Sequence, residues 1–257
     1  MEIWAHRGRS EINELGNSLK NFIASYRLGI SGIETDVCFT ADWKAIIYHP
    51  GSTKLKQYKT KLDLTSLTWP VINNSIFNVM DLDSFLDLAT TLDDLQFCID
   101  IKQDSLYLVE TVVKAVTDRG LQNRVYLTAF QCQIPGFGLE SNAGLLLNAK
   151  EINPTIKTHM IAVWPSNIVK LVKKYKLDAI SFGWLPDSFI SKRLFKLLVF
   201  DEFKLRDQIM EVQKMGIKVW AGIFNKEDDL VYFIKSGVDG IFTDRPLELK
   251  RLLQYYG

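Results

Sequence analysis

The chain has 257 residues, of which 47% are hydrophobic, and 31 Lys and Arg against 30 Asp and Glu give a formal net charge of +1. This composition predicts an ordinary globular protein and argues against the cationic excess that nucleic-acid coats and polybasic membrane patches need. The three cysteines include no CxxC pair, and no apolar run reaches the roughly 18 residues of a membrane span, so we expect a cytoplasmic protein with no nucleic-acid partner and no membrane insertion.

In chain order, short apolar runs alternate with segments of helical period. The candidate strands are residues 2–5, 32–37, 97–101, 125–130, 159–163, 178–182, 217–223 and 240–243. The clearest helical segments are residues 18–29, 105–120, 167–176 and 205–216, and three of them end at a glycine, which favours a left-handed helix cap. Eight strands interleaved with helices in a chain of this length predict an α/β fold, a (β/α)8 TIM barrel, with an open doubly wound sheet as the alternative.

Residues 51–80 interrupt the alternation. This stretch is rich in Lys, Thr and Asn and shows no clear helical period. Long loops without secondary structure of their own are usually functional lids or binding loops. We therefore expect an excursion from the barrel rim near the active site rather than a second domain, and a single domain over residues 1–257.

Acidic, basic and imidazole side chains follow the first three expected strands, where such a barrel carries its reactive groups. Glu34 and Asp36 are spaced i and i+2, so both carboxylates point to one face of the second strand. Asp100 and Lys102 repeat this spacing on the third strand. The whole set comprises His6, Arg7, Glu34, Asp36, His49, Asp100 and Lys102.

The chemistry of this set favours a site that handles phosphate. Three carboxylates at one barrel mouth repel each other, and a hard divalent cation such as Mg²⁺ or Ca²⁺ removes that repulsion. Arg and Lys side chains bind phosphate oxygens, and two histidines can accept and donate protons near neutral pH. Taken singly, each residue also has a structural interpretation, as a surface pair, a solvated strand face or an ion pair. The joint arrangement favours metal-assisted phosphoryl chemistry.

Other residues near the strand ends are weaker candidates. Aromatic side chains at these ends either wall a substrate pocket or fill the barrel interior, and Trp220 is included among the candidate substrate-binding residues. We expect His159 to be structural, since it begins a predicted strand at the end opposite the mouth. We expect a structural ion pair between Asp244 and Arg245, which follow the last strand. The remaining aromatic candidates are Phe130, Trp164 and Trp184.

Four stretches of the sequence together resemble the glycerophosphodiester phosphodiesterases: AHRG, GNSLKNFIASYRLGISGIETDVCFTADWKAIIYH, IDIK and GVDGIFTDRP. The resemblance implies a metal-dependent barrel enzyme, a phosphoric diester hydrolase, that converts a small-molecule glycerophosphodiester into glycerol 3-phosphate and an alcohol. It also implies the roles of single residues: His6 and His49 as the general acid–base pair, Glu34, Asp36 and Asp100 as ligands of Mg²⁺ or Ca²⁺, Arg7 and Lys102 as phosphate-binding residues, and Asn17 as a residue that lines the site.

The chain departs from this family's pattern in several places: Leu15-Gly16-Asn17-Ser18 replaces its Pro-Glu-Asn-Thr motif, and the excursion after His49 lacks its Leu-x-Arg-Thr-Thr pattern. Gly16 stands where the family has the glutamate of a Pro-Glu-Asn-Thr motif, and Glu11 and Glu14 are nearby candidates to supply its contacts. Pro50 stands where an aspartate usually follows the second histidine, and Asp100 stands where the third metal ligand is usually a glutamate. We expect these changes to bear on the identity of the substrate.

Two alternative functions stay open. The apolar segment at residues 189–200 suggests a lysophospholipase D-like enzyme, in which this segment would bind the acyl chain of the lysophospholipid substrate. Such a segment is also typical of a barrel helix that packs its apolar face on the strands. The departures from the motif suggest a non-catalytic barrel that binds phosphodiesters or a protein partner. The alcohol half of the substrate, the choice between Mg²⁺ and Ca²⁺ and the oligomeric state also stay open.

Overall fold

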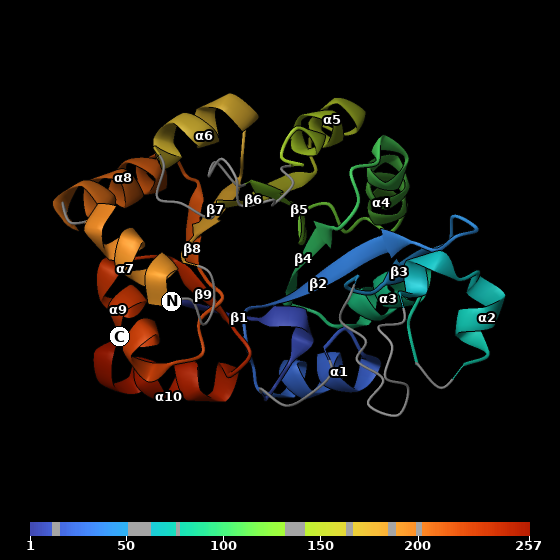
Figure 1. Ribbon diagram of the computed structural model, residues 1–257, viewed down its shortest axis with the longest axis horizontal. Helices are drawn as coiled ribbons and strands as arrows, with labels where there is room; N and C mark the ends of the chain where they lie inside the picture. Colours follow the sequence, from blue (N-terminus) through green and yellow to red (C-terminus); the bar gives the residue numbers. More distant parts are fainter. Residues whose placement is uncertain are drawn as a thin grey trace.

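The strands form a closed ring with helices on its outside, as the alternation of apolar runs and helical segments predicts (Figure 1). The computed structural model describes residues 1–11, 16–50, 63–75, 78–131, 142–162, 167–184, 189–198 and 202–257. The ring strands in these ranges are β1 (Glu2–Ala5), β2 (Gly32–Phe39), β4 (Gln96–Ile101), β5 (Val125–Gln131), β6 (Lys157–Ala162), β7 (Ala179–Phe182), β8 (Lys218–Ala221) and β9 (Gly240–Thr243).

Parallel pairing closes the ring. The strands follow the order β1-β9-β8-β7-β6-β5-β4-β2, and β1 also pairs in parallel with β2. The (β/α)8 barrel is thereby confirmed and the open doubly wound sheet is wrong. Each ring strand agrees with a predicted strand to within two residues at either end.

One strand was not predicted. β3 (Ala45–Ile47) pairs antiparallel with the outer part of β2, so the two form a hairpin that projects from the ring (Figure 1). A run of three residues is too short for its period to distinguish a strand from a loop. The hairpin matters for the site because His49 lies two residues after the end of β3.

Helices cover the outside of the ring. Those longer than five residues are α1 (Leu19–Arg27), α3 (Leu82–Thr91), α4 (Leu106–Asp118), α5 (Leu145–Ile152), α6 (Ile168–Tyr175), α7 (Phe189–Leu198), α8 (Glu202–Lys214), α9 (Glu227–Ser236) and α10 (Pro246–Tyr256). The four predicted helical segments correspond to α1, α4, α6 and α8. Gly29, Gly120 and Gly216 adopt φ angles of 63°, 68° and 76°, the left-handed conformation expected of glycine caps.

The excursion after the hairpin is partly described. Its residues 51–62 and 76–77, on which the expectation of a lid falls, lie outside the described residues. Residues 63–75 contain the 3₁₀ turn η2 (Leu64–Ser66) and the short helix α2 (Trp69–Asn73). Leu64 and Ile72 are buried against Cys38, Ile46 and Tyr48, so this part of the excursion packs on the outer face of the β2–β3 hairpin.

Aromatic rings fill the inside of the barrel near the start of its strands. Trp4, Tyr126, Trp220 and Phe242 form one buried cluster. The Glu2 carboxylate accepts hydrogen bonds from the indole N–H of Trp4 at 3.2 Å and of Trp220 at 2.7 Å. Because the amino ends of the strands are filled in this way, space for a ligand is left toward their carboxyl ends.

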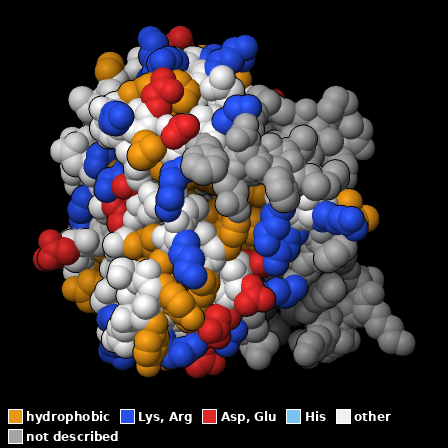
Figure 2. All heavy atoms as spheres, turned by 90° about the vertical axis from the view of Figure 1, so that its left-hand side faces the viewer, with side chains coloured by type: hydrophobic (Ala, Val, Ile, Leu, Met, Phe, Trp, Pro, Cys, Tyr) orange, Lys and Arg blue, Asp and Glu red, His pale blue; other side chains and the backbone are white. Residues whose placement is uncertain are grey.

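The outer surface that includes α8 and α9 mixes charges of both signs with small groups of hydrophobic side chains (Figure 2). Basic and acidic side chains alternate over this face rather than collecting into one large patch. Among the described helices, none combines the length and the hydropathy needed to cross a membrane.

The turn after β1 depends on a glycine. The 3₁₀ turn η1 (His6–Gly8) takes Arg7 and Gly8 to φ angles of 53° and 64°. A Cβ atom on Gly8 would lie 2.3 Å from Cδ1 of Phe22, on α1. Gly8 is therefore required both by its backbone conformation and by the close approach of α1, which explains the glycine in the His-Arg-Gly triplet.

We expect Gly8→Ala to lower the free energy of unfolding more than Gly120→Ala does. Both residues have positive φ, but nothing lies within 4 Å of a Cβ built on Gly120. The backbone conformation alone costs roughly 1–2 kcal/mol for alanine at either position, and the clash with Phe22 adds roughly 1–3 kcal/mol at Gly8. Urea unfolding of both variants measures the difference, and equal losses would contradict the close contact with α1.

Candidate active site

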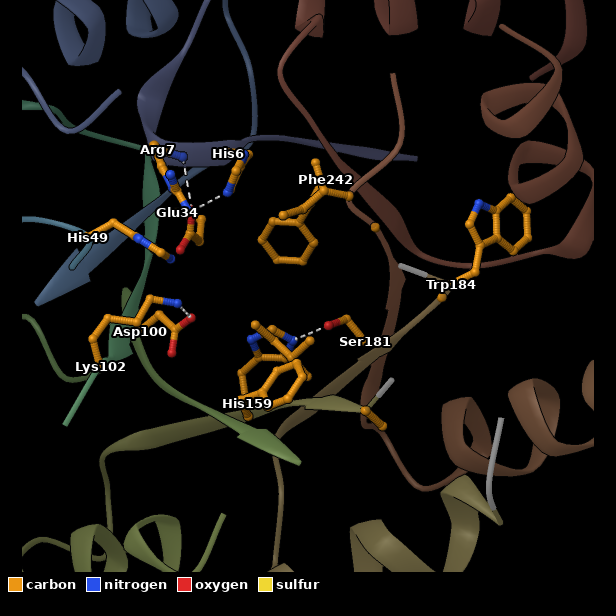
Figure 3. Close-up of a pocket in the computed structure, with 16 residues that line it drawn as sticks. His6, Arg7, Glu34, His49, Asp100, Lys102, His159, Ser181, Trp184 and Phe242 are labelled. Atoms are coloured by element: carbon orange, nitrogen blue, oxygen red, sulfur yellow. Dashed lines mark hydrogen bonds and ion pairs between the residues drawn. The ribbon is translucent and has the colours of Figure 1, made fainter. Parts of the chain in front are cut away.

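A cavity of about 210 Å³ lies at the carboxyl ends of the strands (Figure 3). Six of the nine residues singled out from the sequence line it: His6, Arg7, Glu34, His49, Asp100 and Lys102. They come from the turn after β1, from β2, from the segment after β3 and from the end of β4. The topology thus brings together side chains that lie up to 96 residues apart in the chain.

Three buried carboxylates form the acidic part of this site. The exposed fractions of Glu34, Asp36 and Asp100 are 4%, 0% and 2%. Asp36 and Asp100 are register partners on the adjacent strands β2 and β4, and Glu34 lies two residues before Asp36 on the same face. One oxygen from each of the three carboxylates lies within 4.8 Å of the other two.

Two cations balance part of this negative charge. The Lys102 ammonium lies 3.0 Å from Oδ1 of Asp36 and also donates a hydrogen bond to Asp100, and Arg7 Nε lies 3.0 Å from Oδ2 of Asp36. Burial alone would raise the pKa of Asp36, but Lys102 and Arg7 hold it below its ordinary value. Burial and the neighbouring Asp36 raise the pKa of Glu34 to about 8.

These acidic residues fit a hard divalent cation. Burial and the Asp36 charge also raise the pKa of Asp100, against the opposing effect of Lys102. Oδ1 of Asp100 is buried and accepts no hydrogen bond from any residue in the described ranges. A cation among Glu34, Asp36 and Asp100 would supply the missing partner and would favour the ionised form of all three carboxylates.

His6 is oriented by an aspartate at the opposite end of the chain. Its Nδ1 lies 2.7 Å from Oδ1 of Asp244, and its Nε2 lies 3.8 Å from Oε2 of Glu34 (Figure 3 shows His6 beside Glu34). Although burial opposes it, the hydrogen bond to His6 lowers the pKa of Asp244 to about 2, so the carboxylate is ionised and Nδ1–H must donate to it. Burial lowers the pKa of His6, which leaves its Nε2 unprotonated and facing the cavity at neutral pH.

Asp244 is itself held by two neighbours. Arg9 donates to Oδ1 of Asp244 at 3.0 Å, and Asn225 donates to Oδ2 at 2.7 Å while accepting from the backbone N–H of Asp244 at 2.8 Å. The expected ion pair between Asp244 and Arg245 is absent from the described residues. The Arg245 guanidinium donates to the backbone carbonyl of Asn225 instead. Sequence analysis gave Asp244 the wrong partner, although its place directly after the last strand put it at the same barrel edge as His6.

His49 is oriented by its own backbone. Its Nδ1 lies 2.8 Å from the carbonyl oxygen of Pro50, which can only accept, so Nδ1–H donates and Nε2 is free to accept a proton. Burial is the main cause that lowers the pKa of His49 to about 4. The carbonyl of Pro50 thus does the orienting work for which the sequence comparison expected an aspartate at this position.

Asn17 supports the site without lining the described cavity. Its side-chain amide donates to Oδ2 of Asp36 at 2.8 Å and accepts from the hydroxyl of Thr35 at 2.8 Å, so Asn17 positions a carboxylate rather than a substrate. A Cβ atom on the preceding Gly16 would lie 2.3 Å from Cβ of Arg7. A glutamate at position 16 would therefore displace Arg7, and of its two candidate replacements Glu11 is exposed while residue 14 lies outside the described ranges.

The aromatic candidates divide into two groups. Phe130 and Trp184 line the cavity, whereas residue 164 lies outside the described ranges. Placing Trp220 at the substrate pocket was wrong: its side chain has an exposed fraction of 0% and donates to Glu2 in the aromatic cluster beneath the cavity. The period-2 alternation of β8 does point Trp220 into the barrel, but the rings of Tyr126, His159 and Phe242 pack around it there.

His159 lies in the cavity wall rather than at the opposite end of the barrel. β6 begins two residues before His159, which moves its ring up to the cavity. Its Nδ1 lies 3.1 Å from the hydroxyl of Thr128, and its Nε2 lies 2.9 Å from that of Ser181 (Figure 3 shows His159 and Ser181). Burial lowers the pKa of His159 to about 3, so the ring is neutral and both of its nitrogens are engaged.

The comparisons with known proteins agree on one family. The sequence model of the glycerophosphoryl diester phosphodiesterase family matches residues 6–248. A glycerophosphodiester phosphodiesterase of Caldanaerobacter subterraneus subsp. tengcongensis is 23% identical to the chain, over 98% of both proteins. The crystal structure of a glycerophosphodiester phosphodiesterase from Parabacteroides distasonis is similar with a TM-score of 0.73 and 17% identity, over 98% of this chain and 96% of that one.

A further solved structure carries a ligand. A phosphodiesterase of Oleispira antarctica, in complex with the product sn-glycerol-3-phosphate, is similar with a TM-score of 0.70 and 16% identity, over 99% of this chain and 97% of that one. At these identities the two solved structures establish the shared barrel fold.

We expect His6 to carry its proton on Nδ1 at pH 7, and Asp244→Asn to reduce the fraction of His6 in that tautomer. An ionised aspartate can only accept a hydrogen bond, whereas an asparagine amide can also donate one to an unprotonated Nδ1. The variant therefore no longer requires the proton to be on Nδ1. The ¹⁵N chemical shifts of the His6 ring measure the fraction. The matched change Asp239→Asn affects a carboxylate that accepts from the backbone of Val219 and should leave these shifts unchanged. Identical His6 shifts in both variants would show that Asp244 does not set the tautomer.

Proposed function

The chain belongs to the glycerophosphoryl diester phosphodiesterase family, and we propose that it hydrolyses glycerophosphodiesters to glycerol 3-phosphate and an alcohol with His6 and His49 as the acid–base pair. The observation that carries the proposal is the convergence in one cavity of two imidazoles, the cationic side chains of Arg7 and Lys102, and the carboxylates of Glu34 and Asp100. Asp36 lies directly behind them.

Arg7 and Lys102 bind the phosphate in this proposal. Both side chains line the cavity, and both are held by Asp36, which fixes their positions before a substrate arrives. The guanidinium offers a planar pair of donors to two phosphate oxygens, and the ammonium acts as a point charge on a third. Glu34, Asp36 and Asp100 would hold a divalent cation, Mg²⁺ or Ca²⁺, which when bound neutralises charge on the non-bridging phosphate oxygens.

The two histidines move the protons. In the first step the 2-hydroxyl of the glycerol half attacks phosphorus, and one neutral imidazole takes the proton from that hydroxyl. The other imidazole enters the step protonated, a form that the negative charge of the bound phosphodiester favours, and gives its proton to the alcohol oxygen as the bond from phosphorus to that oxygen breaks. In the second step water opens the cyclic phosphate and the proton transfers run in reverse. Each ring has one nitrogen fixed as a donor, to Asp244 or to the Pro50 carbonyl, so Nε2 of each ring is the atom that exchanges the proton.

The lysophospholipase D-like alternative gains no support from the segment that suggested it. Phe195 of α7 is fully buried, and its ring packs on those of Phe182, Trp184 and Phe233. This is the contact of a barrel helix with the strands and the neighbouring helix, which the sequence analysis weighed against an acyl-chain cradle.

We place the enzyme in the cytoplasm, in the turnover of deacylated phospholipids. The buried cysteines Cys38 and Cys98 are both free thiols, which supports a reducing compartment. The substrate is a small molecule that fits a cavity of about 210 Å³. No oligomeric state is needed to complete the site, since all of the residues proposed to act come from one chain.

We expect purified protein to release glycerol 3-phosphate from glycerophosphodiesters, and His6→Ala and His49→Ala each to lower kcat by roughly 10²–10⁴-fold, the usual contribution of a general acid or base. An enzyme-coupled assay for glycerol 3-phosphate measures the rate. The same assay with a chelator should show loss of activity that added Mg²⁺ or Ca²⁺ restores.

Two controls separate chemistry from folding. Circular dichroism and thermal unfolding of both histidine variants should show a folded protein, because Asp244 keeps its bonds to Arg9 and Asn225 without His6, and the His49 ring bonds to the carbonyl of the next residue. If the wild type has only a trace of activity and both variants keep it, the chain is a non-catalytic phosphodiester-binding barrel and the proposal is wrong.

A further inference from the structure

The cavity has a charged side and an apolar side. His6, Arg7, Glu34, His49, Asp100 and Lys102 form the charged side. Across from them lies what we call the apolar wall, made by six side chains of the carboxyl ends of the later strands: Phe130, Ile161, Ala162, Trp184, Ile223 and Phe242. Figure 3 shows Phe242 and Trp184 on the side of the cavity away from His49 and Lys102. Among the described lining residues, none on the apolar side is charged.

The polar groups on the apolar side are already paired. His159 is neutral and bonds to the hydroxyls of Thr128 and Ser181, and its ring stacks on that of Phe242 at a centroid distance of 5.6 Å. A substrate group rich in hydroxyls would therefore leave some of them without partners, at a cost in binding free energy for each buried hydroxyl.

The aromatic rings of the apolar wall are poorly placed to bind a cation. The ammonium of Lys192 lies 5.4 Å from the centroid of the Trp184 ring, and the same ring packs on Phe195 and Phe224. These contacts argue against the aromatic cage with which proteins bind quaternary ammonium groups.

The volume of the cavity favours a small group. At about 210 Å³ it is smaller than the roughly 300–1,000 Å³ of pockets for drug-sized ligands. It must also hold the phosphate and the glycerol half of the substrate, so the part of the cavity lined by described residues favours a small alcohol group over a long acyl chain.

We propose that the apolar wall binds the alcohol half of the diester, and that this alcohol is short, uncharged and largely hydrocarbon. The inference rests on the proposed function, because it assumes that the phosphate lies at Arg7 and Lys102. Burial of each additional methylene against the wall then contributes to binding of the reacting complex, and a charged headgroup loses its hydration without gaining a partner.

Three synthetic esters of sn-glycerol 3-phosphate test the inference: those of methanol, choline and 3,3-dimethylbutanol. Choline and 3,3-dimethylbutanol have the same shape, and they differ in that a neutral carbon atom of the second replaces the charged nitrogen of the first. We expect kcat/KM for the dimethylbutyl ester to exceed that for the choline ester on the order of tenfold or more, and to exceed that for the methyl ester. The methyl group is too small to make much contact with the apolar wall, so the methyl ester gives the reference rate of diester hydrolysis without that contact.

A matched pair of variants locates the effect. Ile161→Thr, on β6 in the apolar wall, should lower the ratio of dimethylbutyl to methyl hydrolysis by several-fold. Ile152→Thr, at the exposed end of α5, should leave both the ratio and the rates unchanged. If the first variant fails to fold, the comparison of the choline ester with its carbon analogue in the wild type still decides the question.

The outcomes are distinguishable. If none of the three esters releases glycerol 3-phosphate, the proposed function itself is wrong. If the methyl ester is hydrolysed but the choline ester is cleaved as fast as its carbon analogue, the function stands and the inference is overturned. An unchanged ratio in Ile161→Thr, or faster cleavage of lysophosphatidylcholine than of the dimethylbutyl ester, also overturns it.

Discussion

The structure of the site depends on the burial of three carboxylates beside two cations. Glu34, Asp36 and Asp100 are at most 4% exposed, and charges removed from water to this extent are tolerated only with partners. Lys102 and Arg7 supply two of these partners through Asp36, but the raised pKa of Glu34 shows that the balance is incomplete. An unbalanced acidic centre of this kind would be stabilised by a divalent cation, the role proposed for Glu34, Asp36 and Asp100.

Closure of the barrel positions His6 and His49 around that centre. His6 follows the first strand and Asp244 follows the last, and they meet because β1 pairs with β9. The second histidine takes its orientation from the carbonyl of Pro50, which lies beyond the β2–β3 hairpin. A backbone carbonyl and a carboxylate thus perform the same task for two rings, by accepting from Nδ1 and leaving Nε2 free.

The fold and most of the site could be predicted from sequence because strand period and strand order determine both. Glu34 and Asp36 share a face through the period of two, and the rule that reactive groups follow barrel strands selected six residues of the cavity. The errors came from packing and from strand bounds that the pattern does not specify. Trp220 points into the barrel but is covered by the rings of Tyr126, His159 and Phe242. His159 is two residues further into β6 than expected. The link between Asp244 and His6 joins the two ends of the chain, and local pattern carries no information about such a contact.

Direct measurement of metal binding tests the central claim most closely. Isothermal titration with Mg²⁺, Ca²⁺ and Mn²⁺ should show one divalent cation per wild-type chain. Glu34→Gln keeps the shape of the side chain but removes its charge, and should weaken binding at least tenfold, whereas the same change at the exposed Glu110 should have no effect. Equal affinities in the wild type and Glu34→Gln, or no binding by an active wild type, would show that the buried carboxylates are not a metal site.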